Sequence, residues 1–318
     1  MLAEWVEFDH LLRQPGDPDA PIAVSRNGRT FTSALVRQGD GTSIHYPIVQ
    51  NQPVLIAFSR SLAREAIVAM GRSPVKRNPN WIRIAKGWTV GTAKSSARNL
   101  RKFRNCLAQA GGGHPLVLMV GAATRGAGTR DLYEDASVRQ IAFDIYPSPQ
   151  VHFVADAHDI PLASNSVDGV CIQAVLEHVL DPSRVVSEIA RVLKPNGIVY
   201  AETPFMQQVH EGAYDFTRFT ELGHRWLFRD FEAIDRGSLG GAGLSLYWAA
   251  RYFMRGLTRS RTLGDLLSLP FMLAAAMDRL IPEAHRIDSA NGVYFLGWRN
   301  GNGVSLDTLV GEYRGAQR

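Results

Sequence analysis

The chain has 318 residues, of which 45% are hydrophobic, 20% charged and 9% aromatic, and its formal net charge is +5. This composition excludes a disordered or fibrous protein and is typical of a globular chain with one sizeable α/β core and a smaller unit. The two cysteines, Cys106 and Cys171, are far apart, so neither a disulfide framework nor a cysteine-based zinc site is predicted.

Residues 1–70 are predicted to form a small β-rich unit that ends in a helix. Turn signals such as QPGDPDAP and QGDGT separate short strand-like pieces, for example over 45–58, and a helical pattern follows over 61–70. The N-terminus is acidic and lacks the basic-then-apolar layout of a secretion signal. Together with the cysteine content, this pattern predicts a cytoplasmic protein.

Residues 71–113 are predicted to be a basic linker followed by a helix. The segment contains no acidic residue, and its helical pattern over 95–109 is stopped by three glycines. Basic residues interleaved with Trp81 and Trp88 could follow a nucleic-acid backbone, with phosphates neutralised by Lys and Arg and bases stacked on the indoles. The small net charge and the lack of a recognisable RNA-binding module favour a solvated basic face instead.

Over residues 114–300, apolar strand-like runs alternate with helical patterns, which predicts an α/β fold with a doubly wound, mostly parallel seven-stranded sheet. A helix is predicted from Pro182, with Asp181 as its N-cap and the sequence KPNG at its end. The predicted strands cover 116–121, 140–145, 151–156, 167–174, 197–204, 231–238 and 291–299.

The mostly helical residues over about 240–290 separate the last two strands and are predicted to be an insertion that covers one end of the sheet. A tail over 301–318 follows. The longest apolar run, 266–277, contains a proline and falls short of the roughly 20 residues that a membrane span needs. Residues 240–282 could form a lid, lie on a membrane surface that holds a lipid-linked acceptor, or simply pack. The arginines that suggest a membrane contact are Arg251, Arg255, Arg259 and Arg261.

Ligands of open α/β sheets bind at the carboxyl ends of the strands, so the residues that end each predicted strand are candidates. A loop with Gly121 and Gly126 follows the first strand and could let backbone N–H groups approach a ligand, although a simple turn would also explain it. Asp144 ends the second strand and can accept hydrogen bonds from both ribose hydroxyls, or cap a turn. Asp156 ends the third strand beside the small Ala157 and can accept a hydrogen bond from an adenine amino group.

Glu177 and His178 follow the fourth strand in the sequence IQAVLEHV. A Glu–His pair can bind a metal ion, but no third ligand with matching spacing is found. A capping or supporting role is therefore favoured for this pair, and no metal site is predicted.

Taken together, the first strand with its glycine loop, the two aspartates and the sequence VLEHVLDPSRVVSEIARVLKPNGIVYAETP resemble the class I S-adenosylmethionine-dependent methyltransferases of the small-molecule group called methyltransferase type 11. The resemblance covers residues 117–228. It implies a Rossmann-like methyltransferase fold with a final antiparallel strand pair, and S-adenosylmethionine as the cofactor. A nicotinamide-binding fold shares the glycine and acid pattern, but the sequences DAHDIPL and RVLKPNG have no place in it.

The resemblance also implies which residues contact the cofactor. The glycine loop would pack under the methionine part, Asp144 would bind the ribose, and Asp156 would contact the adenine. Gln173 and Ala174 would line the pocket near the methionine part. The predicted cofactor-binding residues are Gly121, Ala122, Ala123, Gly126, Asp144, Ile145, Asp156, Ala157, Gln173 and Ala174.

The chain departs from the family pattern at the glycine loop. Family members usually end the first strand with an acid and continue Gly-x-Gly-x-Gly, whereas Met119, Ala123 and Arg125 stand at those places. Gly126 and Gly128, a little further on, are predicted to restore the flexibility. The N-terminal sequence HYPIVQNQPVLI also resembles, faintly, the small zinc-ribbon-like proteins that activate methyltransferases, but without their cysteines, so this unit would be metal-free.

The predicted acceptor residues lie after the fifth strand, in a segment that forms part of the acceptor pocket in similar methyltransferases. Methyl transfer from a sulfonium is an in-line displacement, so an enzyme mainly positions the acceptor and removes its proton where one must leave. His210 is predicted to be the general base, with Tyr214 and Arg218 positioning the acceptor. In the alternative interpretation, Asp215 and Arg218 form only a helix-surface ion pair.

The sequence therefore predicts a methyltransferase that acts on a small-molecule, glycan or lipid-linked acceptor, with O-methylation favoured. One alternative is a methyltransferase-fold binding or regulatory protein that has lost activity, which Met119 and Ala123 suggest. A methyltransferase that modifies nucleic acid is a third and less favoured interpretation. The oligomeric state is left open.

Overall fold

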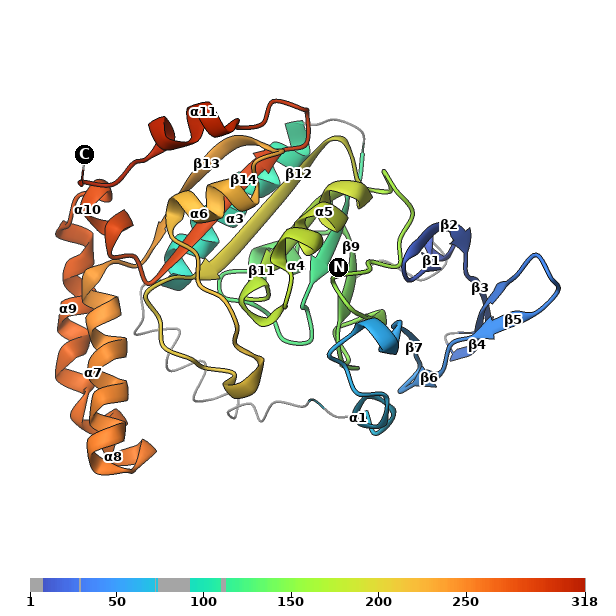
Figure 1. Cartoon of the computed structure of the whole chain (residues 1–318), viewed down its shortest axis with the longest axis horizontal. Coiled ribbons are helices and arrows are strands. Elements are labelled where there is room, and N and C mark those ends of the chain that lie inside the picture. Colours follow the sequence, from blue (N-terminus) through green and yellow to red (C-terminus); the bar gives the residue numbers. More distant parts are fainter. Residues whose placement is uncertain (1–7, 29, 72, 74–91, 110–112, 318) are drawn as a thin grey trace.

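The computed structural model describes residues 8–28, 30–71, 73, 92–109 and 113–317. Within these residues, the centre of the molecule is one nine-stranded sheet with helices on both faces (Figure 1). The order across the sheet is β13 (Glu232–Leu239), β14 (Gly292–Trp298), β12 (Leu193–Pro204), β11 (Val167–Gln173), β8 (Leu116–Val120), β9 (Arg139–Asp144), β10 (Phe153–Ala155), β7 (Gln52–Leu55) and β6 (Ile48–Val49). In this order, all neighbouring strands from β12 to β7 are parallel, whereas the pairs that include β14 or β6 are antiparallel.

Seven of these strands are those that the sequence predicts, each near its predicted bounds. The prediction of a Rossmann-like, mostly parallel sheet that ends in an antiparallel strand pair is therefore confirmed. The predicted count of seven strands is wrong for the whole sheet. Two further strands from the N-terminal residues, β7 and β6, are added next to β10. β7 runs parallel to β10, with Val54 opposite Val154, and all four of its residues are buried.

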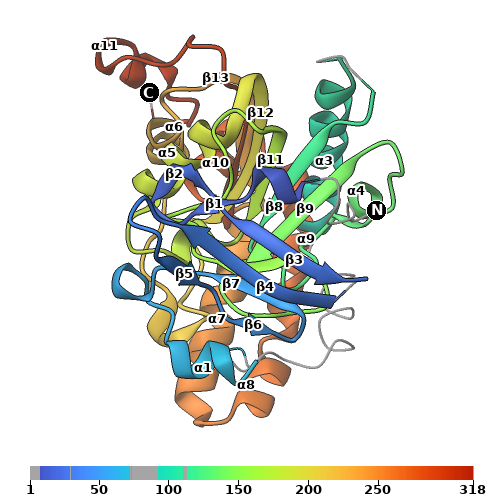
Figure 2. The same cartoon turned by 90° about the vertical axis from the view of Figure 1, so that its right-hand side faces the viewer.

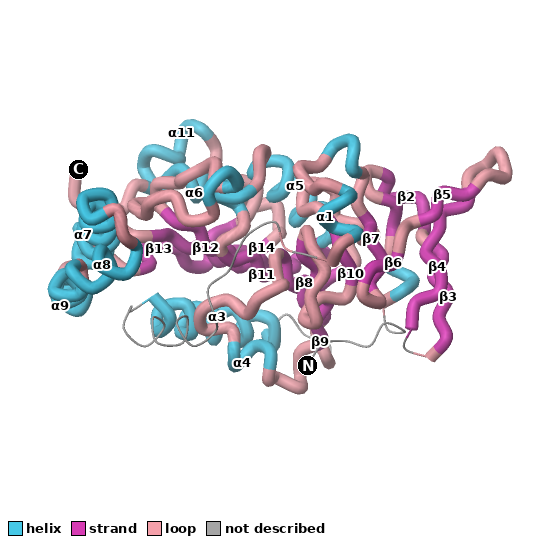
Figure 3. Tube along the Cα trace, turned by 90° about the horizontal axis from the view of Figure 1, so that it is seen from below, coloured by secondary structure: helices cyan, strands magenta, loops and turns pink. Residues whose placement is uncertain are grey.

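The central strands are covered on both faces, as their continuous apolar runs require. Along β8, Leu118 faces a core shared with the helix that follows β11, whereas Met119 faces a core shared with the helix that precedes β8. Figure 3 shows the helices on the two sides of the sheet. One side carries α5 (Pro182–Val192) and α6 (Glu221–Leu227), and the other carries α3 (Thr92–Gln109) and α4 (Arg130–Tyr133).

Helix α5 begins where the sequence predicts. Oδ1 of Asp181 accepts a hydrogen bond from the N–H of Arg184 at 3.0 Å, and Pro182 in the first turn needs no N–H partner. The helix ends at Val192 with Leu193 as its C-cap, directly before KPNG, so the predicted stop at that sequence is confirmed. That sequence lies in β12, because the chain turns directly from the helix into the strand. The buried face of the helix consists of Val185, Val186, Ile189 and Val192.

The N-terminal residues form small antiparallel sheets beside the main sheet, as predicted (Figure 2). Gly16 lies between the first two strands with φ +78°, a conformation that favours glycine. Helix α1 (Glu65–Ala69) is shorter than the helix predicted over 61–70. Trp81 and Trp88 of the basic linker lie outside the described residues. The strands are β1 (Arg13–Gln14), β2 (Asp17–Pro21), β3 (Ala23–Asn27), β4 (Thr30–Arg37) and β5 (Ser43–His45).

The predicted helical insertion lies between β13 and β14 and projects beyond the end of the sheet (Figure 1). Every helix within the described ranges is too short or too polar to span a bilayer. The tail that follows β14 is held to the sheet by Glu312, whose carboxylate lies 2.9 Å from Arg225 and 3.1 Å from Arg236. The inserted helices are α7 (Ala242–Thr258), α8 (Arg261–Leu267), α9 (Met272–Met277) and α10 (Glu283–Asp288), and the tail carries α11 (Leu306–Leu309).

Candidate functional site

A pocket lies at the carboxyl ends of β8, β9, β10 and β11, the sheet edge at which ligand binding is predicted. Gly121 follows β8, Asp144 ends β9, Asp156 follows β10 and Ala174 follows β11. Another wall comes from the N-terminal unit, through five residues within 62–68. The empty space is about 1050 Å³, a figure that includes the solvent at its open mouth.

Asp144 holds the glycine loop that follows β8. Its Oδ2 accepts a hydrogen bond from the N–H of Ala123 at 2.9 Å, and its Oδ1 accepts one from the N–H of Ile145 at 2.8 Å. Gly121 has φ +71°, and a Cβ at this position would lie 2.2 Å from Cγ2 of Val175. Only glycine fits here, because both the backbone conformation and the neighbouring side chain exclude a larger residue.

Gln173 ties the same loop to a buried carboxylate. Its Nε2 donates to the carbonyl of Ala127 at 3.2 Å and to Oε2 of Glu202 at 2.9 Å. A Cβ at Gly126 would lie 2.3 Å from Oε1 of Gln173, so the loop passes too close for a side chain. Burial raises the pKa of Glu202, and hydrogen bonds from Tyr200 and Gln173 oppose that rise. A carboxylate on β12 thus supports the loop, although β8 itself ends without an acid.

Asp156 is buried and hydrogen-bonded on both carboxylate oxygens. Oδ1 accepts a hydrogen bond from the N–H of His158 at 2.9 Å and lies 2.6 Å from its ring Nδ1, while Oδ2 accepts one from the hydroxyl of Ser61. Burial alone would raise the pKa of Asp156, but these hydrogen bonds outweigh it and hold the pKa below its usual range. Ser61 belongs to the N-terminal unit, so that unit reaches the acid predicted to contact adenine.

Most of the predicted cofactor-binding residues come together in this region. Ala123 does not line the pocket or the smaller cavity beside it. Its N–H donates to Asp144, and its carbonyl accepts a hydrogen bond from Ser148 at 2.9 Å. Ala174 has φ +52°, an uncommon conformation for a residue with a side chain. The main pocket is lined by Gly121, Asp144, Ile145, Asp156, Ala157 and Ala174, and a smaller cavity beside it by Gly121, Ala122, Gly126 and Gln173.

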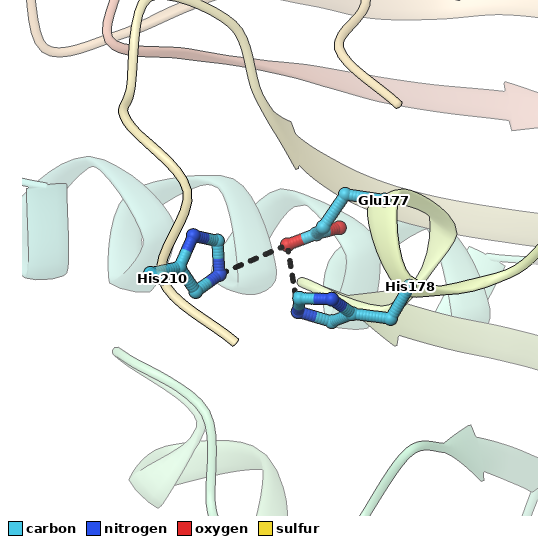
Figure 4. A group of neighbouring side chains, drawn as sticks. All are labelled: Glu177, His178 and His210. Atoms are coloured by element: carbon cyan, nitrogen blue, oxygen red, sulfur yellow. Dashed lines mark ion pairs between the residues drawn. The ribbon is translucent and has the colours of Figure 1, made fainter. Parts of the chain in front are cut away.

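Three side chains from two segments converge beside the pocket (Figure 4). Glu177 and His178 lie in the 3-10 turn η4 (Leu176–His178) directly after β11, and His210 lies in the loop after β12. Oε1 of Glu177 is 3.7 Å from Nε2 of His178 and 3.8 Å from Nε2 of His210. The sequence predicted no metal site because it offered no third ligand for the Glu–His pair. The structure brings His210 to that pair.

The loop that carries His210 is folded around Asp215 and Arg218. The guanidinium of Arg218 donates to both oxygens of Asp215 and, through Nε, to the carbonyl of Gln207 at 2.9 Å. Oδ2 of Asp215 also accepts a hydrogen bond from the N–H of His210 at 2.9 Å. Arg218 and Asp215 therefore form an ion pair, as the alternative interpretation expects, but in a loop that they order and not on a helix surface. The third predicted catalytic residue, Tyr214, lines the pocket together with His178.

Burial determines the charges of this region. It raises the pKa of Glu177 to about 8, and the charge of Arg218 opposes the rise. Burial and the nearby His178 lower the pKa of His210, so this imidazole is neutral at neutral pH. Burial would also raise the pKa of Asp215, but hydrogen bonds from Arg218 and from the N–H of His210 bring it down to about 2.

Sequence reasoning missed three residues that shape the site. Ser61 gives no local signal, because it lies 95 residues from its partner Asp156. His158 stands two residues after Asp156, within hydrogen-bond reach of that carboxylate, and this spacing could have been noticed. Glu202 is an acid within an otherwise apolar predicted strand, which is a sign of a buried carboxylate with a specific role.

Residues 120–201 match a protein family described as a methyltransferase domain, of type 11. The matched stretch contains the glycine loop, Asp144, Asp156 and the Glu177–His178 pair. This part of the chain is therefore similar to class I, S-adenosylmethionine-dependent methyltransferase domains, as the sequence motifs predicted.

Three examples show which known proteins are similar to the chain. The demethylmenaquinone methyltransferase of Renibacterium salmoninarum is 28% identical over 149 residues, which are 42% of this chain and 63% of that protein. This match therefore spans less than two thirds of the relative. A crystal structure of a protein described as a sarcosine dimethylglycine methyltransferase from Galdieria sulphuraria has a TM-score of 0.43 at 16% identity, with 66% of this chain and 86% of that one covered. The 1,6-didemethyltoxoflavin-N1-methyltransferase of Burkholderia thailandensis, with 1,6-didemethyltoxoflavin and S-adenosylhomocysteine bound, has a TM-score of 0.40 at 14% identity, with 71% and 92% covered.

Proposed function

We propose that the protein transfers a methyl group from S-adenosylmethionine to a small-molecule, glycan or lipid-linked acceptor. One observation carries this proposal: the glycine loop and the acids after two neighbouring parallel strands line the same pocket. Asp144 would bind the ribose hydroxyls and Asp156 the adenine amino group, because a carboxylate accepts hydrogen bonds from both kinds of donor. Gly121 would let the backbone approach the methionine part of the cofactor.

For methyl transfer, the main task of the protein is to position the acceptor next to the methyl group. The methyl group moves from the sulfonium to a nucleophilic atom of the acceptor, the cofactor leaves as a neutral thioether, and any acceptor proton passes to a base. His210 is the proposed base, because its neutral imidazole can take that proton and its loop adjoins the pocket. Tyr214 would contact the acceptor, and Arg218 would act by ordering the loop. O-methylation is favoured over N-methylation.

Calorimetry with S-adenosylhomocysteine tests the cofactor site. Wild-type protein should bind it, and Asp144→Ala should weaken binding by at least about tenfold, because the ribose and the glycine loop both lose an acceptor. Asp168→Ala is the matched control. This acid also accepts a backbone hydrogen bond, from Leu116, but it lies at the amino ends of the strands, away from the pocket. No binding by the wild type would overturn the proposal. Binding without turnover of any acceptor would favour the alternative, a cofactor-binding regulatory protein.

The inserted helices favour an acceptor that is held at a membrane. Their outer surface exposes large apolar side chains, with Phe253 at 65% and Leu257 at 70% exposed. Arg259 and Arg261 are exposed at the junction of α7 and α8, so an anionic bilayer complements this surface in both polarity and charge. The hydroxyl of Tyr252 on α7 donates to the carbonyl of Val209 at 2.5 Å, next to His210. The remaining large apolar side chains exposed on these helices and their connections are Leu246, Leu263, Leu266, Leu267, Leu269, Leu273, Met277 and Leu280.

Sedimentation with lipid vesicles tests this part of the proposal. The full chain should pellet with phosphatidylglycerol vesicles more than with phosphatidylcholine vesicles, since arginines add electrostatic attraction to apolar burial. Phe253→Ser with Leu257→Ser should abolish pelleting. Leu306→Ser removes a leucine that is 72% exposed on α11, outside the inserted helices, and should leave pelleting unchanged. No vesicle binding, or equal loss in both variants, would rule out the membrane surface.

A further inference from the structure

We propose that Glu177, His178 and His210 form a binding site for one divalent transition-metal cation such as Zn²⁺. The three ligand atoms, Oε1 of Glu177 and the two Nε2 atoms, all lie within 4.8 Å of one another (Figure 4). Two imidazoles and one carboxylate are the protein ligands of many catalytic zinc centres, which keep a further position open. This inference goes beyond methyl transfer and concerns a site beside the cofactor pocket.

The gap between the ligand atoms has the size of a cation. The distances of 3.7 Å and 3.8 Å from the carboxylate oxygen to the two imidazoles are too long for hydrogen bonds. Ligands of a tetrahedral cation with bonds of about 2.1 Å lie about 3.4 Å apart. The two distances from the carboxylate exceed this spacing by only about 0.3–0.4 Å, and the ligand atoms of the two imidazoles, which lie within 4.8 Å of each other, would also have to approach.

The imidazole of His178 is oriented as metal ligands are. Nδ1 of His178 lies 2.6 Å from the carbonyl of Tyr214, which can only accept, so Nδ1 carries the proton and Nε2 presents its lone pair. Nδ1 of His210 lies 3.3 Å from Oδ2 of Asp215 without forming a hydrogen bond among the described residues, so a small rotation of this ring would be needed to give it the same support. A carbonyl or carboxylate on the far ring nitrogen is the usual support of a metal-bound histidine.

Glu177 supplies the independent indication of a ligand. Its side chain is 1% exposed, and among the described residues neither of its oxygens has a hydrogen-bond partner. Its main chain, by contrast, is firmly held, because its carbonyl accepts hydrogen bonds from Phe216 at 2.8 Å and Thr217 at 3.3 Å. A buried acid without any donor is costly, whether it stays charged or takes up a proton, and a cation would supply the partner that it lacks.

The donor set selects the kind of cation. Imidazole nitrogens suit zinc, iron, nickel and copper, whereas magnesium and calcium prefer oxygen ligands alone. Because His178 lines the pocket, a cation at this site would lie at the wall where the acceptor is proposed to bind. If the proposed methyl transfer also holds, the cation could bind an acceptor oxygen, and His210 would then be a ligand instead of the base.

Metal binding can be measured without any methyl acceptor. The tag-free full chain, stripped with a chelator, should bind Zn²⁺ in calorimetry at one equivalent, and Co²⁺ should produce visible d–d absorption. His210→Ala and Glu177→Gln should each weaken binding by at least about 100-fold and remove the Co²⁺ bands, since each deletes a ligand. His210 lies on a loop and is 22% exposed, so its variant should fold even if a change at Glu177 does not.

His285→Ala is the matched control, because it removes an exposed histidine on α10. It should leave both the stoichiometry and the affinity unchanged. A wild-type chain that binds no cation would overturn the proposal and leave a bridging water as the occupant of the gap. Equal binding by His210→Ala and the wild type would overturn it as well. S-adenosylhomocysteine binding, measured on the same samples, separates these failures from failure of the proposed function.

Discussion

Asp144 and Asp156, on the cofactor side of the site, each have a hydrogen-bond donor on both carboxylate oxygens, whereas Glu177, on the acceptor side, has none on either. All three acids are buried within one region of the sheet edge. The two aspartates are held in place by the protein itself, so they are ready to accept further hydrogen bonds from a cofactor. Glu177 is held only through its main chain, and burial without a donor raises its pKa to about 8.

Because of this difference, we expect the proposed cofactor side and the proposed acceptor side to respond differently when a ligand binds. On the cofactor side, binding adds to a network that already exists, so removal of a donor or acceptor should weaken both folding and binding. On the acceptor side, the protein alone bears the cost of an unpaired carboxylate, so removal of that group should favour folding while it abolishes cation binding.

The largest effect is expected from Gly121→Ala, which changes only the cofactor side. The added Cβ would lie 2.2 Å from Cγ2 of Val175 at φ +71°, so overpacking and backbone strain together should cost about 2–4 kcal/mol of unfolding free energy. Cofactor binding should be lost and cation binding retained. Gly113→Ala has φ +79° and no atom within 4 Å of its Cβ, and it should cost only about 1 kcal/mol. Urea unfolding of both variants checks this, and equal losses would contradict it.

The second prediction compares the two kinds of acid directly. In chelator, Glu177→Met should raise the unfolding free energy by about 1–3 kcal/mol, because an apolar side chain of similar size replaces a buried group without partners. Asp156→Ala should lower it by about the same amount, because it strands the donors of Ser61 and His158. Urea unfolding provides both values. A destabilising Glu177→Met change would mean that the carboxylate already has a partner.

The third prediction concerns His224, another buried group without a partner in the described part of the chain, which serves as a comparison for Glu177 because it does not line the pocket. Its Nε2 also has no partner within the described residues, but its ring packs on Phe219 and Phe228, away from the pocket lining. Burial lowers the pKa of His224 to about 3. Below the unfolded-state pKa of about 6.5, the unfolded chain therefore binds one proton more, and stability falls as pH falls, by up to about 1.4 kcal/mol per pH unit.

His224→Phe should remove this part of the pH dependence. Relative to wild type, the variant should gain about 2 kcal/mol in unfolding free energy between about pH 7 and about pH 5. Urea unfolding at the two pH values measures the difference, and an unchanged slope would show that the folded protein already accommodates the charged imidazole. Zn²⁺ binding should be the same in both proteins.

The smallest effect is expected from Ser61→Ala. Removal of the hydroxyl takes one donor from Oδ2 of Asp156 and should cost about 1 kcal/mol of unfolding free energy in the free protein. With S-adenosylhomocysteine bound the cost should shrink, because an adenine amino group can donate to the same oxygen. Thermal or urea unfolding with and without the ligand gives this comparison, and an undiminished cost would indicate that adenine does not reach Asp156.

Local patterns were enough to predict the sheet and the edge at which the pocket lies. The apolar runs, the N-cap at Asp181 and the aspartates at two strand ends are readable within a few residues, and parallel topology then places the strand ends at one edge. The glycine loop could be located but not explained. Its supports, the N–H of Ala123 on Asp144 and the amide of Gln173, are contacts between separate strand ends.

The parts that could not be predicted depend on contacts between distant residues. The addition of β7 to the sheet and the hydrogen bond of Ser61 to Asp156 join the N-terminal unit to residues about a hundred positions later. His210 reaches Glu177 because a loop is folded by Arg218, and no spacing rule describes such an approach. The sequence did offer one signal of the buried acid. Glu177 lies between Leu176 and Val179, two apolar residues that are both buried in the structure.

The parallel pairing of β7 with β10 has a consequence for synthesis. During translation the N-terminal unit leaves the ribosome first, yet Val54 cannot meet Val154 until the chain beyond β9 has emerged. Until then β7 is a short apolar strand with an open edge, the kind of segment that chaperones bind and that pairs with other chains. The N-terminal unit is thus completed by a later part of the chain, so a chain that stops before β10 would leave β7 without its parallel partner.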